Sequence, residues 1–289
     1  MPTSLPMTTT SAAAASVAVA VAAGFGVMSA EPVILSDGAN VIVHLSPSPV
    51  VAKVAATTML VRPDVAAWLQ RELDVASFLA RGNAPVLAPS AEVPATTHTA
   101  DGHVMSFWRY LRQSGNALPG EAAIGSMLRD LHAALRGYPA ALGLLTPLDD
   151  IPRFIARTGT LLSAADRSML GAAFARLTAE LDPDSCAVQP LHGDAGGGNL
   201  MAAGTGWVWH DFEDTCSGPV AWDLAASTAS QRMDGTRILR AYGTPVDAAQ
   251  LAVCEQLRRL HLTVWYALYA ERLPEHRQRA AELLASWQV

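Results

Sequence analysis

The sequence predicts an α+β protein with two lobes, a small β-rich lobe followed by a larger, mostly helical one. Short β-branched runs separated by turn residues occupy the first third of the 289-residue chain, whereas apolar residues recur at helical spacing through most of the remainder. A polar segment rich in glycine and proline, RQSGNALPG at residues 112–120, separates the two patterns. We therefore expect the lobes to span residues 1–110 and 111–289.

The small lobe is expected to begin with an antiparallel meander, because tight turn clusters separate its first three β-branched runs. These runs cover residues 32–35, 41–45 and 50–54. Residues 64–80 then place their apolar side chains on one helical face, and Pro63 precedes them at a favourable helix start. Two further strands are expected at residues 92–97 and 103–108.

The large lobe is expected to be helical with two short interruptions. Helical spacing covers residues 121–136, 148–158, 164–181, 247–271 and 275–287. The interruptions are short strands at residues 188–191 and 207–209, and each leads into a polar motif that contains aspartate.

The N-terminal region resembles a leader segment. Residues 11–23, SAAAASVAVAVAA, resemble the apolar core of an export signal, but no Lys or Arg precedes them and the run is too short to span a bilayer. We expect residues 1–25 to form a disordered leader that runs into a helix or strand of the small lobe, with an export signal as the alternative. No later stretch is a candidate membrane span, so we expect no membrane partner.

Charge and cysteine content argue against some kinds of partner and site. The net charge is −6 and no cluster of Lys or Arg stands out, so a nucleic acid partner is not expected. The cysteines, Cys186, Cys216 and Cys254, are widely spaced and form no CxxC pair. This spacing argues against a disulfide framework or a zinc site and favours a reducing, cytoplasmic compartment. The composition is compatible with a monomer or a homodimer.

A region rich in carboxylates carries the clearest chemical signal. The motif LHGDAGGGNLM contains Asp194 and, five residues later, Asn199, while Asp211 opens a second motif, DFED. Oxygen ligands of this kind suit Mg²⁺, which takes its remaining ligands from water and substrate phosphates. Phosphoryl transfer uses one carboxylate to accept the proton of the attacking hydroxyl and further oxygen ligands to hold the metal. The pattern therefore favours magnesium-dependent phosphoryl transfer.

The series HGDxxxxN, DFxD and WDLA, the last at residues 222–225, resembles the aminoglycoside phosphotransferase family of small-molecule kinases. This family is similar to choline kinase and, more distantly, to the protein kinases. The resemblance implies a two-lobed, protein kinase-like fold. It also implies that Asp194 is the catalytic base and that Asn199 and Asp211 are metal ligands.

Three further residues have supporting roles in this interpretation. The resemblance implies that His192 is a structural residue of the catalytic loop. It implies that Asp223 ties down the start of a helix, where an acidic side chain is favourable. Asp214 either assists metal or substrate binding or is a solvated or helix-capping carboxylate.

The small lobe contains a matching set of nucleotide-binding candidates. Lys53 lies in an apolar strand, and Glu72 follows nineteen residues later on the next helix. This order matches the Lys–Glu ion pair that positions ATP phosphates in kinase-like folds. The turn with Gly38 and Asn40 would then cover the phosphates. A lone lysine in such a strand is otherwise an edge or snorkelling residue.

A hinge that meets adenine is expected at residues 105–110. Its backbone, including Ser106, would contact the base, with Phe107 and Trp108 nearby; an ordinary interior strand is the alternative. The chain has no GxxxxGK[ST] motif, so a P-loop NTPase is not supported.

The catalytic loop departs from the family pattern. Residues 195–198, AGGG, fill the place where family members commonly carry a His-Pro pair, and Gly193 rather than Arg precedes Asp194, so a protein substrate is not expected. We expect an ATP-dependent phosphotransferase that moves the γ-phosphoryl of Mg-ATP to a hydroxyl of a small molecule, such as an aminoglycoside-like antibiotic, an amino sugar or another alcohol. The alternative is a kinase-fold nucleotide-binding module without turnover, which the glycine-rich loop keeps open.

Overall fold

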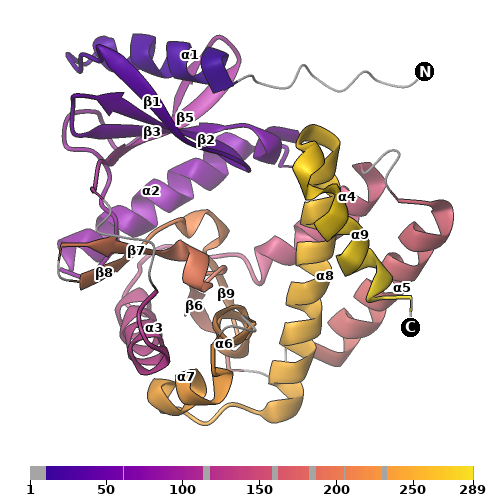
Figure 1. The fold of residues 1–289 in the computed structure, drawn as a ribbon. Coiled ribbons are helices and arrows are strands. Elements are labelled where there is room, and N and C mark those ends of the chain that lie inside the picture. The colour runs from indigo at the N-terminus through magenta and orange to yellow at the C-terminus, as the bar shows by residue number, and fades with distance from the viewer. Residues whose placement is uncertain are drawn as a thin grey trace. The chain divides into compact units, whose positions relative to one another are not determined.

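The computed structural model describes residues 11–60, 62–112, 118–157, 162–181, 187–204, 206–229 and 233–288. The chain folds into two compact units, whose elements are labelled in Figure 1. The first unit contains residues 1–116 and 202–213, and the second contains residues 117–201 and 214–289. The lobe boundary expected from the sequence lies after residue 110, whereas residues 202–213, which fall in the expected second lobe, belong with the first unit. No helix in the described part of the chain is both long and apolar enough to cross a membrane.

The first unit is built on a five-stranded antiparallel sheet with the order β1-β2-β3-β5-β4. Its strands are β1 (Glu31–Asp37), β2 (Asn40–Ser46), β3 (Val50–Ala55), β4 (His98–Ala100) and β5 (His103–Arg109). The first three strands form the expected meander. The strand expected at residues 92–97 is wrong, because these residues form bends and β4 begins at His98. Pro94 lacks the N–H that a strand ladder needs.

Different helices cover the two faces of this sheet. Strand side chains alternate between the faces. Val43, Val54 and Phe107 lie on the face that packs against α1 (Ser11–Ala23). Ala55 lies on the other face and packs with Leu69 of α2 (Val65–Arg81). Figure 1 shows α1 and α2 on opposite sides of the strands.

Helix α1 corrects the expectation of a disordered leader over residues 1–25. Ala14, Ala18 and Ala22 recur at helical spacing and are completely buried in the cluster formed with the sheet. Alanine has the highest helix propensity, and its small side chain allows a helix to approach a sheet closely. Residues 1–10 lie outside the described part of the chain.

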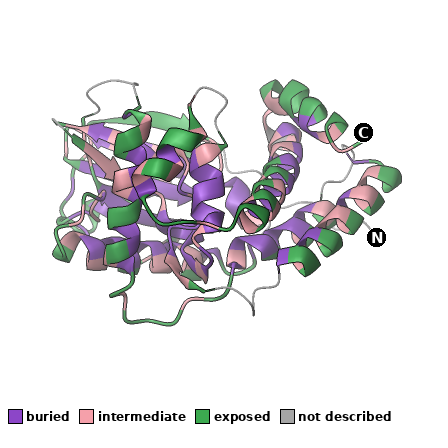
Figure 2. Cartoon of the chain, turned by 90° about the horizontal axis from the view of Figure 1, so that it is seen from below, coloured by how far each residue is buried: buried purple, intermediate pink, exposed green. Residues whose placement is uncertain are grey.

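The second unit is mostly helical, as expected. Its helices are α3 (Glu121–Leu135), α4 (Asp150–Arg157), α5 (Ala164–Leu181), α6 (Ala221–Thr228), α7 (Gly235–Tyr242), α8 (Ala248–Arg272) and α9 (Arg277–Ala285). Helix α8 packs against α4, α5, α6 and α9. The strands β6 (Gln189–Leu191) and β9 (Cys216–Gly218) form a short antiparallel pair; along the chain, β6 precedes the HGD motif and β9 follows the DFED motif. Figure 2 shows that the helices combine buried and exposed residues around their circumference, as expected of amphipathic helices.

Several short elements complete the fold. Single 3₁₀ turns cover Thr57–Leu60, Thr146–Asp149, Gly197–Asn199, Phe212–Asp214 and Pro274–His276. The strands β7 (Leu200–Ala203) and β8 (Gly206–Trp209) pair with each other. Trp209 is fully buried. Its backbone N–H donates to the carbonyl of Pro85 at 2.9 Å, and its backbone carbonyl accepts from the backbone N–H of Leu87 at 2.8 Å. These bonds attach β8 to the first unit and position Asp211, two residues further on.

Candidate active site

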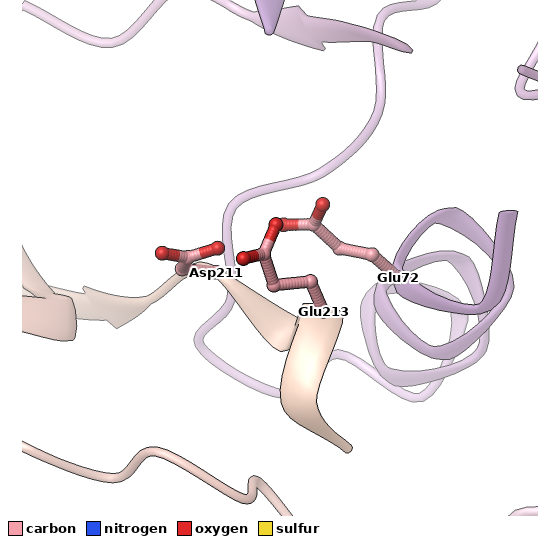
Figure 3. A group of neighbouring side chains, drawn as sticks. All are labelled: Glu72, Asp211 and Glu213. Atoms are coloured by element: carbon pink, nitrogen blue, oxygen red, sulfur yellow. The ribbon is translucent and has the colours of Figure 1, made fainter. Parts of the chain in front are cut away.

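Lys53 lies at the centre of a buried group of carboxylates in the first unit. Because side chains alternate along β3, Lys53 points to the same face as Ala55, the face that packs with α2. Its Nζ lies 2.8 Å from Glu72 Oε2, 2.6 Å from Asp211 Oδ1 and 2.9 Å from Glu213 Oε2. Figure 3 shows the three carboxylates pointing toward one another. The structure thus brings Lys53 and Glu72 together and adds two more acidic partners.

The identity of the cation at this position is informative. Lys53 is the only lysine among the 20 Lys and Arg residues of the chain. An ammonium is a compact point charge with three rotatable donors, whereas a guanidinium is a planar fork. Three carboxylates within 2.9 Å of one nitrogen require the compact donor. We infer that shape as well as charge selects lysine here.

Asp211 is the most accessible of the three carboxylates. Its side chain is 36% exposed, against 2% for Glu72 and 9% for Glu213. Its backbone adopts a left-handed conformation with φ of 66°, which is uncommon for a residue other than glycine. Phe212, the next residue, is completely buried and anchors this turn. Asp211 is therefore the carboxylate of this group that a bound metal ion can reach.

Glu213 belongs to this group although it is not among the site residues expected from the sequence. Its Oε1 accepts from Arg62 Nη1 at 3.0 Å and its Oε2 accepts from Asn40 Nδ2 at 3.1 Å. The Arg62 guanidinium in turn lies 3.8 Å from the ring centroid of Trp68. The available signal for Glu213 in the sequence was Arg62, the lone arginine of the otherwise apolar segment MLVRP. In the structure Arg62 is 2% exposed, and an arginine buried to this extent needs an acidic partner.

The turn with Gly38 and Asn40 is occupied with internal contacts. The Asn40 side chain is buried and accepts from Thr58 Oγ1 at 2.9 Å in addition to its bond to Glu213. The carbonyl of Gly38 accepts from Thr57 Oγ1 at 3.1 Å. In this structure the Asn40 side chain therefore holds Glu213, and the turn expected to cover the phosphates is fixed to Thr57 and Thr58.

Electrostatics in the group favour the charged form of lysine and disfavour that of Glu72. Burial opposes the charge on Lys53, but Asp211, Glu213 and Glu72 outweigh it and raise the pKa of Lys53 well above its ordinary value. Burial, together with the charges of Asp211 and Glu213, raises the pKa of Glu72 to about 8 despite the attraction of Lys53. The buried group thus has more acidic than basic side chains, and an added cation would relieve this imbalance.

The chemistry of this donor set fits a hard divalent cation, with one restriction. Glu72, Asp211 and Glu213 place carboxylate oxygens within 4.8 Å of one another, close enough to share an ion. However, Lys53 Nζ already lies within 2.9 Å of an oxygen from each. The centre of the group is therefore a lysine site, and a metal ion would bind to the exposed side of Asp211.

Residues 106–108, part of the expected adenine hinge, lie within the sheet. Phe107 pairs with Ala52 of β3 on one side, and on the other side its carbonyl accepts from the N–H of Ser90 at 3.0 Å. Its side chain lies on the sheet face that packs against α1. Ser106 is fully buried opposite Lys53, and its Oγ accepts from Trp108 Nε1 at 2.9 Å. The backbone at Phe107 is paired within the sheet, so this segment has the character of an interior strand.

Asp223 holds the expected catalytic loop, which lies in the second unit. Asp223 lies in the first turn of α6, but its bonds differ from the expected helix-start role. Its two oxygens accept from the backbone N–H groups of His192 and Gly193 at 2.8 and 2.9 Å, and Oδ2 also pairs with His132 Nε2 at 2.9 Å. Burial opposes its charge, but these hydrogen bonds lower the pKa of Asp223 below its ordinary value. His192 is fully buried within the loop, consistent with a structural position.

Asp194 and Asn199 lie in direct contact at the start and end of the glycine-rich segment. Asn199 Nδ2 donates to the Asp194 carbonyl at 2.7 Å and to Asp194 Oδ2 at 2.9 Å. The other carboxylate oxygen, Oδ1, pairs with Arg258 of α8. Burial opposes the charge on Asp194, but Arg258 outweighs it and lowers the pKa of Asp194 to about 2. Asp194 is therefore ionised at neutral pH, as a proton acceptor must be.

Gly193 is the one position of this loop where a side chain cannot fit. Its φ is +88°, and an added Cβ would lie 1.8 Å from the carbonyl oxygen of Asp214. Asp214 itself is buried and contributes to the charge environment of Arg258. The HGD motif can therefore approach Asp214, the last residue of DFED, only because residue 193 is glycine.

We predict that Gly193→Ala disrupts this loop. The added methyl group must displace the Asp214 backbone, and the alanine must adopt a left-handed backbone conformation. A loss of about 2–4 kcal/mol in the free energy of unfolding is therefore expected. Urea unfolding measures it. Gly198→Ala is the matched control, because its Cβ would meet nothing within 4 Å and its φ is not positive. Equal stability of the two variants would contradict this description of the loop.

Comparison with known proteins identifies the family and the fold of the chain. A model of the phosphotransferase enzyme family APH matches residues 36–252, which is more than half of the chain. The chain belongs to this phosphotransferase family. The resemblance found in the sequence motifs is confirmed, and so is the kinase-like fold. Comparison with curated protein sequences gives no significant match.

Solved structures of small-molecule kinases share the fold at low sequence identity. The amicoumacin kinase hAmiN, in complex with AMP-PNP, Ca²⁺ and Ami, has a TM-score of 0.68 at 11% identity, with 93% of this chain and 92% of that chain covered. The microcompartment-associated aminopropanol kinase gives 0.66 at 17% identity, covering 93% and 95%. The choline kinase LicA from Streptococcus pneumoniae gives 0.63 at 16% identity, covering 90% and 95%.

Proposed function

We propose that the protein is an ATP-dependent phosphotransferase that moves the γ-phosphoryl group of Mg-ATP to a hydroxyl of a small molecule. The observation that carries the proposal is Asp194, which is ionised, partly exposed and fixed at both carboxylate oxygens by Asn199 and Arg258. A carboxylate held in this way can orient the hydroxyl of an acceptor and accept its proton as the phosphoryl group is transferred.

The other residues have roles that follow from their surroundings. Lys53, braced by Glu72, is proposed to bind the phosphates of the nucleotide. The amide oxygen of Asn199 and the exposed carboxylate of Asp211 are proposed as ligands of Mg²⁺, which prefers such oxygens. When bound, the metal would neutralise charge on the β- and γ-phosphates. His192 and Asp223 are proposed to support the loop.

The acceptor is proposed to be a small alcohol. The relatives of known structure include kinases named for amicoumacin, choline and aminopropanol. An aminoglycoside-like antibiotic, an amino sugar or another amino alcohol is therefore a reasonable acceptor for this chain. A protein acceptor is not proposed, since Gly193 stands where the protein-kinase pattern has arginine.

The experiment is a measurement of ADP release from Mg-ATP across a panel of aminoglycosides, macrolides, amino sugars, choline-like alcohols and simple sugars. We expect at least one acceptor to stimulate release, and removal of Mg²⁺ with EDTA to abolish it. Binding of Mg-ATP without release of ADP for any acceptor would instead favour a nucleotide-binding module without turnover. GTP is tested in parallel as the phosphoryl donor.

A further inference from the structure

A helix distant in the sequence anchors the catalytic loop through one arginine. Arg258 of α8 pairs through Nη2 with Asp194 Oδ1, and its Nη1 donates to the carbonyl of Gly193 at 3.0 Å. The guanidinium carbon lies 5.0 Å from the ring centroid of Trp222, whose Nε1 donates to the same carbonyl at 2.8 Å. The Arg258 side chain is only 14% exposed. Arg258 is thus held at three points, all on or beside the loop.

The glycine segment that follows Asp194 is loosely packed at two of its positions, Gly196 and Gly198. Residues 195–198 include three consecutive glycines, which lose more conformational freedom on folding than other residues. A Cβ at Gly198 would meet nothing within 4 Å, and one at Gly196 would meet only the Ala226 carbonyl oxygen at 3.8 Å. The rest of the segment is held more closely: Ala195 is completely buried and its carbonyl accepts from Ser227 Oγ at 2.6 Å, and a Cβ at Gly197 would lie 3.1 Å from Leu118 Cδ1. Packing thus leaves Gly196 and Gly198 loosely confined, and we infer that side-chain bonds help to define the direction of the Asp194 carboxylate.

We propose that Arg258 is a positioning residue for the catalytic carboxylate. By binding Oδ1 while Asn199 binds Oδ2, it fixes the plane of the Asp194 carboxylate and offsets the freedom of the glycine segment. The inference rests on the proposed function, in which Asp194 accepts the proton of the acceptor hydroxyl. Arg258 acts through Asp194, so its loss should affect the transfer step and leave nucleotide binding by the first unit unchanged.

The test compares Arg258→Met with Arg259→Met in the full-length protein. Methionine keeps an unbranched apolar stem beside Trp222 and removes the charge and the donors. Arg259, the next residue of α8, is the matched control, because its guanidinium lies 4.2 Å from the ring centroid of Trp287. We expect Arg258→Met to lower kcat by about 100-fold, the scale of a misplaced catalytic group. KM for the nucleotide should not change, and Arg259→Met should behave as wild type.

Two further measurements separate positioning from a structural role. Added guanidinium ion should restore part of kcat in Arg258→Ala, and Arg258→Lys should retain more activity than Arg258→Met. A double-mutant cycle with Asp194→Asn, followed by urea unfolding, should show that the two residues are coupled in stability. Absence of coupling, or a kcat for Arg258→Met equal to that of Arg259→Met, would overturn the proposal. So would a loss of kcat that neither guanidinium nor lysine relieves.

Failure of the proposed function gives a different result. In that case the wild-type protein releases no ADP with any acceptor, although the double-mutant cycle still shows coupling. That combination would reject the catalytic role of Asp194, and with it the positioning role of Arg258. Activity in the wild type with no effect of Arg258→Met would reject the positioning role alone.

Discussion

Asp194→Asn is expected to lower acceptor-dependent phosphoryl transfer by about 10³-fold, because a positioned general base contributes on the order of 10²–10⁴-fold. Asparagine has nearly the same shape but cannot accept the proton of the acceptor hydroxyl. It also places a neutral amide against Arg258. Nucleotide binding should persist, since Lys53 and Glu72 belong to the other unit. The rate is measured as ADP release at saturating Mg-ATP and acceptor, and nucleotide binding by calorimetry.

The control for this variant is Asp130→Asn. Asp130 lies on α3, is 65% exposed and pairs with Arg129. Its substitution should leave both transfer and nucleotide binding unchanged. Transfer by Asp194→Asn at a rate close to that of the wild type would show that another group accepts the proton, and the assignment of Asp194 would be withdrawn.

Lys53→Met is expected to affect both stability and nucleotide binding. It removes the cation that Glu72, Asp211 and Glu213 share, and loss of one partner from a buried ionic group typically costs about 3–5 kcal/mol. The loss should be larger at pH 9 than at pH 6. At pH 6 Glu72, whose pKa is raised to about 8 even beside Lys53, is protonated in both proteins, whereas at pH 9 it is ionised in the wild type and its attraction to Lys53 stabilises only the wild type. Urea unfolding at the two pH values measures this difference.

The proposed binding of a nucleotide at Lys53 can be followed by chemical labelling. Lys53 is the only lysine, so a lysine-reactive nucleotide analogue should label the wild type at Lys53, and peptide mapping distinguishes this site from the N-terminal amine. Lys53→Met/Glu72→Gln removes one of the carboxylates and should regain part of the lost stability without regaining nucleotide binding. Recovery of nucleotide binding in the double variant, or labelling elsewhere, would contradict the role of Lys53.

The sequence was sufficient to predict the groups that lie close to a motif. Lys53 and Glu72 could be paired because their order, on a strand and on the next helix, matches the Lys–Glu ion pair of kinase-like folds. Asp194 and Asn199 could be paired because five residues separate them within one loop. In both cases local structure and one recognisable motif limited the alternatives.

Contacts that join distant segments could not be predicted in the same way. Arg258 lies 64 residues from Asp194, and Arg62 lies 151 residues from Glu213. Each arginine is one of many, and its partner depends on how helices and strands pack. The contacts of Asp223 could not be predicted for a similar reason. Its position at the start of α6 was visible, but the loop it binds could be identified only from the fold.

At two other places, α1 and the strand at Phe107 and Trp108, the sequence pattern did not indicate the packing that the structure shows. The buried face of α1 is made of alanines, and the other positions of that segment are also mostly alanine and valine, so no contrast between polar and apolar faces indicated a packed helix. At Phe107 and Trp108 the composition suited either a hinge or an interior strand. In the structure these two residues also pair with residues 89 and 90, on the loop that follows α2, and the sequence contains no marker of that pairing.

Transfer of a radiolabelled γ-phosphoryl group tests the central claim most directly. The protein is incubated with Mg-ATP labelled at the γ-phosphate and the best acceptor from the panel, with Asp194→Asn as the comparison. The account predicts that the label appears in a phosphorylated acceptor with the wild type and that this product is reduced about 10³-fold in the variant. Label found only in ATP or inorganic phosphate, or equal product from both proteins, would contradict it.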